Sequence, residues 1–180
     1  MDEQRLWAPW RLGYVAGDDQ PAEPTLPREW LAGASRECFV CRAAGEFAAP
    51  SEAHREHLVV EVGEHAVAIL NRYPYANGHL LVCPRRHAGD LAELTADENR
   101  ECLELLTRYT ERYRTLIRAE GFNIGLNLGR TAGAGVPGHL HWHLVPRWPG
   151  DSNFMPVTAG IRVIPQSLEA LWEALTDNDV

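Results

Sequence analysis

The sequence predicts an α+β protein built on an antiparallel sheet, and three patterns support this. Residues 58–62 and 66–70 are apolar runs joined by a short turn, which is typical of a β-hairpin. Residues 95–119 repeat apolar side chains at helical spacing. Further along, polar and apolar residues alternate as they do on a half-buried strand. That stretch is His139-Leu140-His141-Trp142-His143-Leu144-Val145.

The composition excludes several classes of function. The chain has 180 residues, which is the size of one domain with a substantial core. Its net charge of −8 argues against a surface for nucleic acid or anionic membranes, since both need basic patches. All 17 basic residues are arginine, which rules out Schiff-base chemistry on a lysine. No apolar run is long enough to span a membrane and the first residues lack a signal-peptide core, so we expect a cytoplasmic protein.

The first 37 residues are predicted to be an arm and a linker, and residues 38–180 to form the main domain. Residues 5–14 hold two Trp, one Tyr and two Leu. These side chains need cover from their own domain, a second subunit or a ligand pocket. Residues 16–36 are rich in Pro and Gly without periodicity, which indicates a linker.

Cys38 and Cys41 form a C-x-x-C pair, followed by a short predicted helix over 42–47. Two thiolates at this spacing supply half of the ligands of a tetrahedral zinc ion. A thioredoxin-like redox role needs a βαβ unit, which the following sequence does not offer. His54 and His57 are ligands by proximity only, because residues 48–57 read as a solvated loop.

The remaining elements follow in order along the chain. Residues 71–78 have turn chemistry. Thr95 and Glu98 are spaced as a capping box at the start of the long helix. The other predicted elements are strands over 79–83, 122–129 and 161–164, a Gly-rich loop over 129–138 and a helix over 167–175.

The three histidines of the alternating stretch share one strand face, which favours chemistry at phosphorus. The motif holds no carboxylate for protease or glycosidase chemistry. A neutral imidazole is a good nucleophile, which suits His141, and His143 can donate a proton to the bridging oxygen. Backbone N–H groups of the Gly-rich loop, including those of Gly133 and Gly135, suit the non-bridging oxygens.

Two metal arrangements compete for the same histidines. Three histidines can form a catalytic metal site of the His₃ type. Alternatively, a closed structural Cys₂His₂ site forms from Cys38, Cys41, His87 and His139. His87 is included because it follows a strand end. The second arrangement leaves His141 and His143 free for chemistry.

The alternating histidine stretch resembles the H-φ-H-φ-H-φ-φ signature of the histidine triad superfamily, and the similarity extends over about residues 38–165. The resemblance implies a five-stranded antiparallel sheet with one long and one or two short helices, paired into a two-fold homodimer. It also implies a HIT-like catalytic domain over 38–180 and a nucleotidyl-histidine intermediate on His141. Cys38, Cys41, His87 and His139 match the ligands of the zinc-containing branch, and no organic cofactor is implied.

The same resemblance implies substrate contacts and a reaction. Asn71 matches the residue that holds the ribose, and Asn127 the one near the phosphates. The tail from Pro146 to Phe154 is similar to a bacterial subgroup that degrades diadenosine tetraphosphate by phosphorolysis. His143 stands where uridylyltransferases tend to have Gln, which favours phosphorolysis or hydrolysis.

One segment departs from the family pattern. Residues 134–138 offer no polar side chain to the phosphates, although many members carry Gln or Ser there. This departure keeps two alternatives open, a hydrolase of nucleoside phosphoramidates and a non-catalytic, zinc-stabilised nucleotide-binding or interaction protein.

Overall fold

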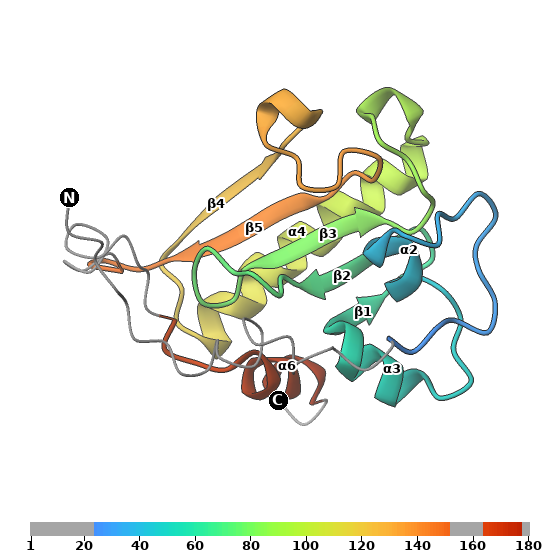
Figure 1. The fold of residues 1–180 in the computed structure, drawn as a ribbon. Coiled ribbons are helices and arrows are strands. Elements are labelled where there is room, and N and C mark those ends of the chain that lie inside the picture. The colour runs from blue at the N-terminus through green and yellow to red at the C-terminus, as the bar shows by residue number, and fades with distance from the viewer. Residues whose placement is uncertain (1–23, 152–163, 178–180) are drawn as a thin grey trace, which may run out of the picture.

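The structure is a computed structural model that describes residues 24–151 and 164–177. A five-stranded antiparallel sheet runs through it in the order β1-β2-β3-β5-β4 (Figure 1). The strands are β1 (Val59–Val62), β2 (Ala66–Leu70), β3 (Leu80–Pro84), β4 (Gly121–Leu126) and β5 (Trp142–Arg147). The α+β class and the five-stranded antiparallel sheet are therefore confirmed.

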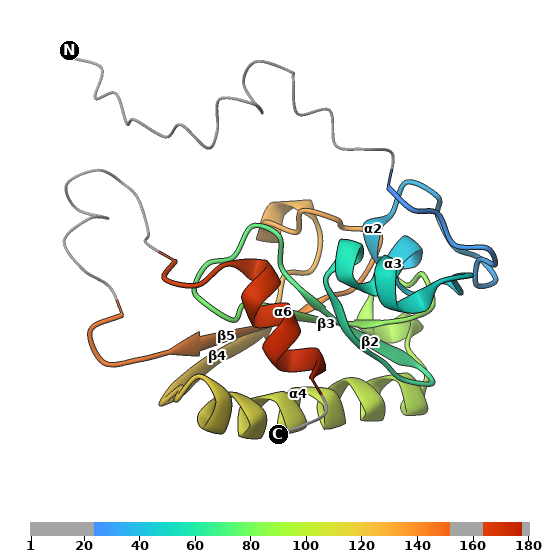
Figure 2. The ribbon, with the colours of Figure 1, turned by 90° about the horizontal axis from the view of Figure 1, so that it is seen from below.

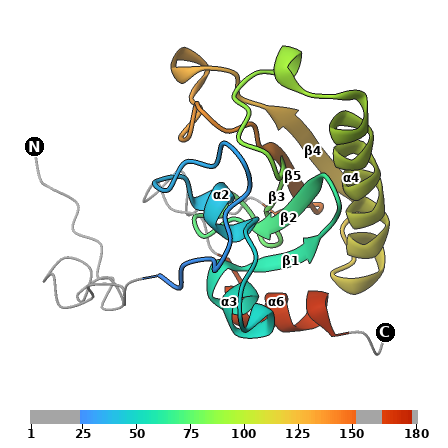
Figure 3. The same cartoon turned by 90° about the vertical axis from the view of Figure 1, so that its right-hand side faces the viewer.

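Helices cover the two faces of the sheet unequally. The long helix α4 (Ala96–Leu116) packs along one face (Figure 2), and the short helix α2 (Phe39–Ala43) lies on the opposite face (Figure 3). Helix α6 (Leu168–Thr176) contacts β1, where the Trp172 indole donates a hydrogen bond to a β1 carbonyl. On the face opposite α4, helix α2 covers only part of the sheet (Figure 3). The rest of that face is called the open face below.

Helix α4 forms as the sequence predicts. The Thr95 hydroxyl accepts from the Glu98 backbone N–H, and the Glu98 carboxylate accepts from the Thr95 N–H, which completes the capping box. Its apolar stripe then enters the core, where Tyr109 and Tyr113 are among the largest fully buried side chains. The capping box fixes the residue at which this helix begins, and the apolar stripe fixes which side of the helix faces the core.

Three boundaries differ from the sequence prediction. Residues 48–57, expected as a loop, form helix α3 (Pro50–His57), which buries only Ala53 and so shows no apolar stripe. Helix α2 begins at Phe39, not at residue 42, so Cys38 is its N-cap residue. The histidine strand begins at Trp142 and not at residue 139, because a hydrogen bond from the Leu140 N–H to the Ala88 carbonyl replaces ladder pairing.

Some predictions fall outside the described residues. The aromatic arm over 5–14 lies there, and so does the strand predicted over 161–164, except for its last residue. Within residues 24–151 and 164–177, no helix has the length and apolar character that crossing a membrane requires.

Candidate active site and metal centre

Four side chains gather at the end of β3, where α2 approaches the sheet. The Cys38 and Cys41 sulfurs and the His87 and His139 Nδ1 atoms all lie within 4.8 Å of one another. Cys38 Sγ is 3.3 Å and Cys41 Sγ is 3.4 Å from His139 Nδ1. Cys41 Sγ and His139 Nδ1 each lie 3.2 Å from His87 Nδ1. The closed arrangement predicted from the sequence is thus assembled, and His54 and His57 are not part of it.

This donor set fits a tetrahedral zinc ion. Standard Zn–S and Zn–N bond lengths place such ligand atoms about 3.3–3.6 Å apart, close to the observed separations. The His139 Nε2–H donates to the Pro84 carbonyl oxygen at 2.8 Å, which turns the Nδ1 lone pair toward the cluster. Burial lowers the pKa of His139 to about 4, so this imidazole is neutral as a metal ligand must be.

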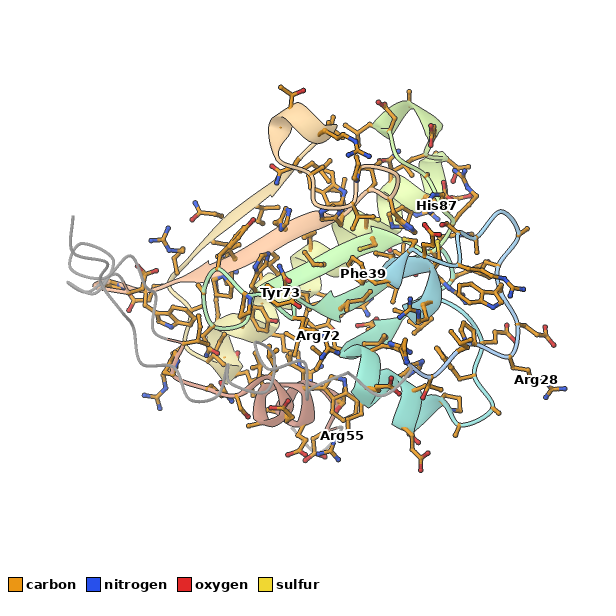
Figure 4. All side chains as sticks on the ribbon, viewed as in Figure 1. Arg28, Phe39, Arg55, Arg72, Tyr73 and His87 are labelled. Carbon is orange, nitrogen blue, oxygen red and sulfur yellow. The ribbon has the colours of Figure 1, made fainter. Side chains whose placement is uncertain are left out.

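The segment that carries His87 is held by an ion pair. Arg86 donates from Nε and Nη2 to the two Glu98 oxygens, both at 2.9 Å, and also donates to the Glu93 carbonyl. Glu98 is 5% exposed, and the Arg86 hydrogen bonds lower its carboxyl pKa. Figure 4 shows His87 in the segment that follows β3, next to α2. Helix α4 therefore helps to position a metal ligand through its capping residue.

His141 and His143 lie on the open face of the sheet. Pro146 lies on the α4 face, because its side chain and that of Ile117, the residue that caps the end of α4, both approach Gly78. His143 has the opposite parity on β5, so its side chain lies on the face away from α4. The His141 Nδ1–H donates to the His139 carbonyl oxygen at 2.8 Å, which leaves the Nε2 lone pair for chemistry.

A chain of hydrogen bonds fixes the tautomer of His143. The Tyr75 backbone N–H donates to His79 Nδ1 at 3.1 Å, so His79 carries its proton on Nε2. This Nε2–H donates to His143 Nδ1 at 2.9 Å, which leaves the His143 proton on Nε2. That buried Nε2–H has no hydrogen-bond partner among the residues that the structure describes, and the His143 ring stands edge-on to His141 at 5.1 Å between centroids.

The environment favours the neutral forms of His79 and His143. Burial, and then the neighbouring His143 and His141, lower the pKa of His79 to about 4. Burial and His141 also lower the pKa of His143 below its ordinary value. Because His79 stays neutral, its Nδ1 accepts and its Nε2 donates throughout the physiological pH range. His79 therefore orients His143 through a hydrogen bond without adding a positive charge to the site.

His79 is the functional residue that sequence reasoning missed. The sequence places it only at the start of the strand predicted over 79–83. Its position depends on Gly78, which has φ +76° and whose missing Cβ would lie 2.9 Å from the Ile117 Cδ1. Gly-His before an apolar strand is a weak signal, and only the folded sheet brings His79 beside His143.

The remaining predicted residues surround the open face. Asn71 follows β2, and its side chain approaches His79 Nδ1 at 3.2 Å and accepts from the Tyr73 N–H. Asn127 follows β4, and Gly133 and Gly135 are exposed in the loop toward His139. Figure 4 shows Arg72 and Tyr73 at the near side of this face, below Phe39. Substrate contacts of Asn71, Asn127, Gly133 and Gly135 are predictions from the sequence.

Comparison with known proteins gives the same picture at the level of the family. Residues 52–150 match the model of the HIT domain. A protein of Mycobacterium tuberculosis named AP-4-A phosphorylase is 40% identical over 166 residues, which cover 92% of this chain and 78% of that protein. The adenosine 5′-monophosphoramidase of Schizosaccharomyces pombe is 30% identical over 62% of this chain and 80% of its own length.

A solved structure supports the fold and the metal centre. A zinc-bound histidine triad family protein from Mycobacterium smegmatis superposes with a TM-score of 0.55 and 28% identity. The match covers 66% of this chain and 81% of that protein. Family, fold and a metal-binding donor set thus agree.

Proposed function

The chain belongs to the HIT domain family, and from this premise we propose that it is an enzyme that cleaves dinucleoside polyphosphates such as diadenosine tetraphosphate. The observation that carries this proposal is the pair of opposite tautomers on one sheet face. His141 presents a lone pair on Nε2, and His143 presents a proton on Nε2 beside it. A nucleophile next to a donor is what displacement at phosphorus requires.

In the first step His141 Nε2 attacks the phosphorus of the substrate that bears one nucleoside. A P–N bond forms and the bond from phosphorus to the bridging oxygen breaks, which releases the rest of the substrate as a nucleotide. The His143 Nε2–H donates to the bridging oxygen as negative charge develops on it. His79 keeps this proton in place, because its own Nε2–H occupies His143 Nδ1.

In the second step an oxygen of the acceptor attacks the same phosphorus and the P–N bond breaks. With inorganic phosphate as acceptor, diadenosine tetraphosphate gives ADP and ATP, and with water it gives AMP and ATP. We favour phosphate, because the relative that spans most of this chain is named a phosphorylase. The resemblance of the tail from Pro146 to Phe154 to that subgroup supports the same choice.

The metal centre acts on this chemistry indirectly. Four protein ligands fill a tetrahedral coordination sphere, so a bound zinc ion supplies folding energy and has no open position for substrate. Cys38, Cys41, His87 and His139 would hold it. The carbonyl that orients His141 belongs to His139, so the metal ligand and the nucleophile share one short backbone segment.

The substrate is proposed to lie across the open face, between the turn over 71–78 and the Gly-rich loop over 129–138. Asn71 would contact the ribose and Asn127 the phosphates. The N–H groups of Gly133 and Gly135 would hold non-bridging oxygens, in place of the polar side chains that residues 134–138 lack. Gly133 has φ +87°, a conformation that suits a loop presenting its backbone to an anion.

We also propose that two copies pair through β4. This strand is at the edge of the sheet, and its Ile124 side chain is 48% exposed. Leu128, which follows the strand, is 42% exposed. Pairing of two β4 edges would cover both side chains and satisfy the open ladder. The cytoplasmic location and the absence of nucleic acid partners stay predictions from the composition.

The test is incubation with diadenosine tetraphosphate, with and without inorganic phosphate, and identification of products by mass. We expect ADP plus ATP that depend on phosphate, and a loss of about four orders of magnitude in rate for His141→Asn. AMP plus ATP in plain buffer would mean hydrolysis. Turnover retained by His141→Asn would overturn the mechanism.

A second candidate function is cleavage of adenosine 5′-phosphoramidate. The similarity to the Schizosaccharomyces pombe enzyme of that name favours it. The same nucleophile would act, and only the leaving group would differ. Rates with the two substrates under the same conditions decide which one the site prefers, and binding of both without any product would support the non-catalytic alternative.

A further inference from the structure

A groove continues the open face beyond His143. It has a volume of about 290 Å³ and is lined by Tyr75, Asn123, Val145 and Arg147. On β5, Val145 and Arg147 share the parity of His143, and Asn123 pairs with Val145 in the β4–β5 ladder. Tyr75 joins the groove to the reactive histidines, because its ring stacks on His143 with 5.9 Å between centroids.

The lining of the groove suits a nucleoside better than a phosphate. The Arg147 guanidinium pairs with both oxygens of Asp151 and donates to Asn123 Oδ1 at 2.8 Å, so its charge is balanced. The Asn123 amide nitrogen has no hydrogen-bond partner within the described part of the chain. Tyr75 offers an aromatic ring that is half exposed, and Val145 is buried. Aromatic, apolar and amide groups together are what stacking on and hydrogen bonding to a base need.

Most of the groove lies beyond His143, away from Asn71. Tyr75 lies between the two sides, because its ring stacks on His79 at 4.7 Å and its N–H donates to the His79 Nδ1 that Asn71 also approaches. Asn71 follows β2, which lies on one side of β3, whereas β5 and β4 lie on the other side. Val145 is four residues beyond His141, or about 13 Å along an extended chain. A mononucleotide with its phosphorus at His141 and its ribose at Asn71 would leave Asn123, Val145 and Arg147 uncovered. A second nucleotide, attached through a polyphosphate chain, would reach them.

We propose that this groove binds the nucleoside of the leaving nucleotide, so that one chain holds both ends of a dinucleoside polyphosphate. This inference rests on the proposed function and adds a second binding subsite to it. It predicts that the enzyme distinguishes substrates by what lies beyond the reacting phosphorus. Ligands with two nucleosides should depend on the groove, and ligands with one nucleoside on the Asn71 side should not.

The experiment compares two ligands on the zinc-loaded full chain with the His141→Asn substitution, which blocks cleavage. Affinities for diadenosine tetraphosphate and for AMP are measured by calorimetry, with and without Asn123→Trp. The indole fills the groove from an exposed position on β4. We expect affinity for diadenosine tetraphosphate to fall at least tenfold and affinity for AMP to stay unchanged.

Two further variants keep this test decisive. Leu103→Trp is the control, because it adds the same indole at an exposed position of α4, on the other side of the sheet from the groove, and it should change neither affinity. Asn123→Leu removes the amide with little change in volume, and it should weaken diadenosine tetraphosphate binding about threefold. Equal losses for both ligands, or no loss for either, would overturn the proposal. Failure of the proposed function is separate, since it would appear as absent turnover in the protein with His141 intact.

Discussion

Two pairs of histidines in this protein have the same ring separation and different surroundings. His87 and His139 have centroids 5.1 Å apart, and so do His79 and His143. In the first pair both Nδ1 atoms converge with two sulfurs, which makes a closed set of metal donors. In the second pair one imidazole donates to the other, which leaves a proton facing the open face.

This difference shows that the role of each imidazole is decided by the hydrogen bond at its other ring nitrogen, the one that faces away from the metal centre or from His143. The Pro84 carbonyl takes the Nε2–H of His139 and turns its Nδ1 lone pair to the metal. The Tyr75 N–H takes Nδ1 of His79 and turns its Nε2–H to His143. The Pro84 carbonyl belongs to β3 and the Tyr75 N–H to the turn that leads into β3, so the fold assigns one pair to metal binding and the other to proton placement.

The largest expected effect comes from opening the metal pair. Cys41→Ser should abolish stoichiometric zinc and lower the free energy of unfolding by about 4 kcal/mol or more, because the metal links α2 to the sheet. Metal analysis and denaturant unfolding measure both. Cys102→Ala is the control, since it removes another buried thiol outside the cluster and should keep the zinc. Full zinc in Cys41→Ser would contradict the assignment.

Changing the pair of His79 and His143 should lower the rate of cleavage and leave zinc binding and stability nearly unchanged. His143→Gln should lower the rate of cleavage by about 10²–10³-fold, because the donor at the bridging oxygen is lost. The zinc content and the melting temperature should stay close to those of the unmodified protein. His65→Gln, a partly exposed histidine away from the site, serves as the control. A fall in zinc together with activity would mean that the two pairs are not independent.

The pH dependence of stability sharpens the same comparison. The pKa of His79 is about 4 in the folded protein and near 6.5 when unfolded, so the unfolded chain binds the extra proton first as pH falls. Stability should therefore decrease between pH 6.5 and pH 4, by about 3 kcal/mol from this residue. His79→Gln should remove that part of the slope in unfolding curves measured across this range. An unchanged slope would show that His79 is not the buried neutral group described here.

The smallest expected effect tests how the His87 segment is supported. Glu98→Gln weakens the pairing with Arg86 and should reduce zinc affinity about tenfold, with about 2 kcal/mol of stability lost. Competition with a chelator measures the affinity. Glu104→Gln is the matched control on the same helix, because its ion pair with Arg100 is exposed and contributes little. Equal effects of the two variants would show that the Arg86 pairing has no special role in metal binding.

Several features were predictable because they depend on local spacing. The capping box at Thr95 and Glu98 and the apolar periodicity behind it specified helix α4. The apolar runs of β2 and β3 specified two buried strands. The metal donors were identified from the C-x-x-C pair together with histidines after strand ends and from the family resemblance. Helix α3 was missed because it is polar on almost every side and is stabilised by tertiary contacts.

The sequence by itself determined which chemical groups this protein has: paired thiols, alternating imidazoles, a glycine-rich loop and no lysine. The residue pattern left two metal arrangements open and the family resemblance favoured the one with His139, but only the tertiary structure brought His79 to His143 from another strand. The physical reason is that a tautomer depends on a hydrogen-bond partner distant in the chain. Pro84 lies 55 residues before His139, and His79 lies 64 residues before His143. Such pairings exist only after β3 and β5 have come together.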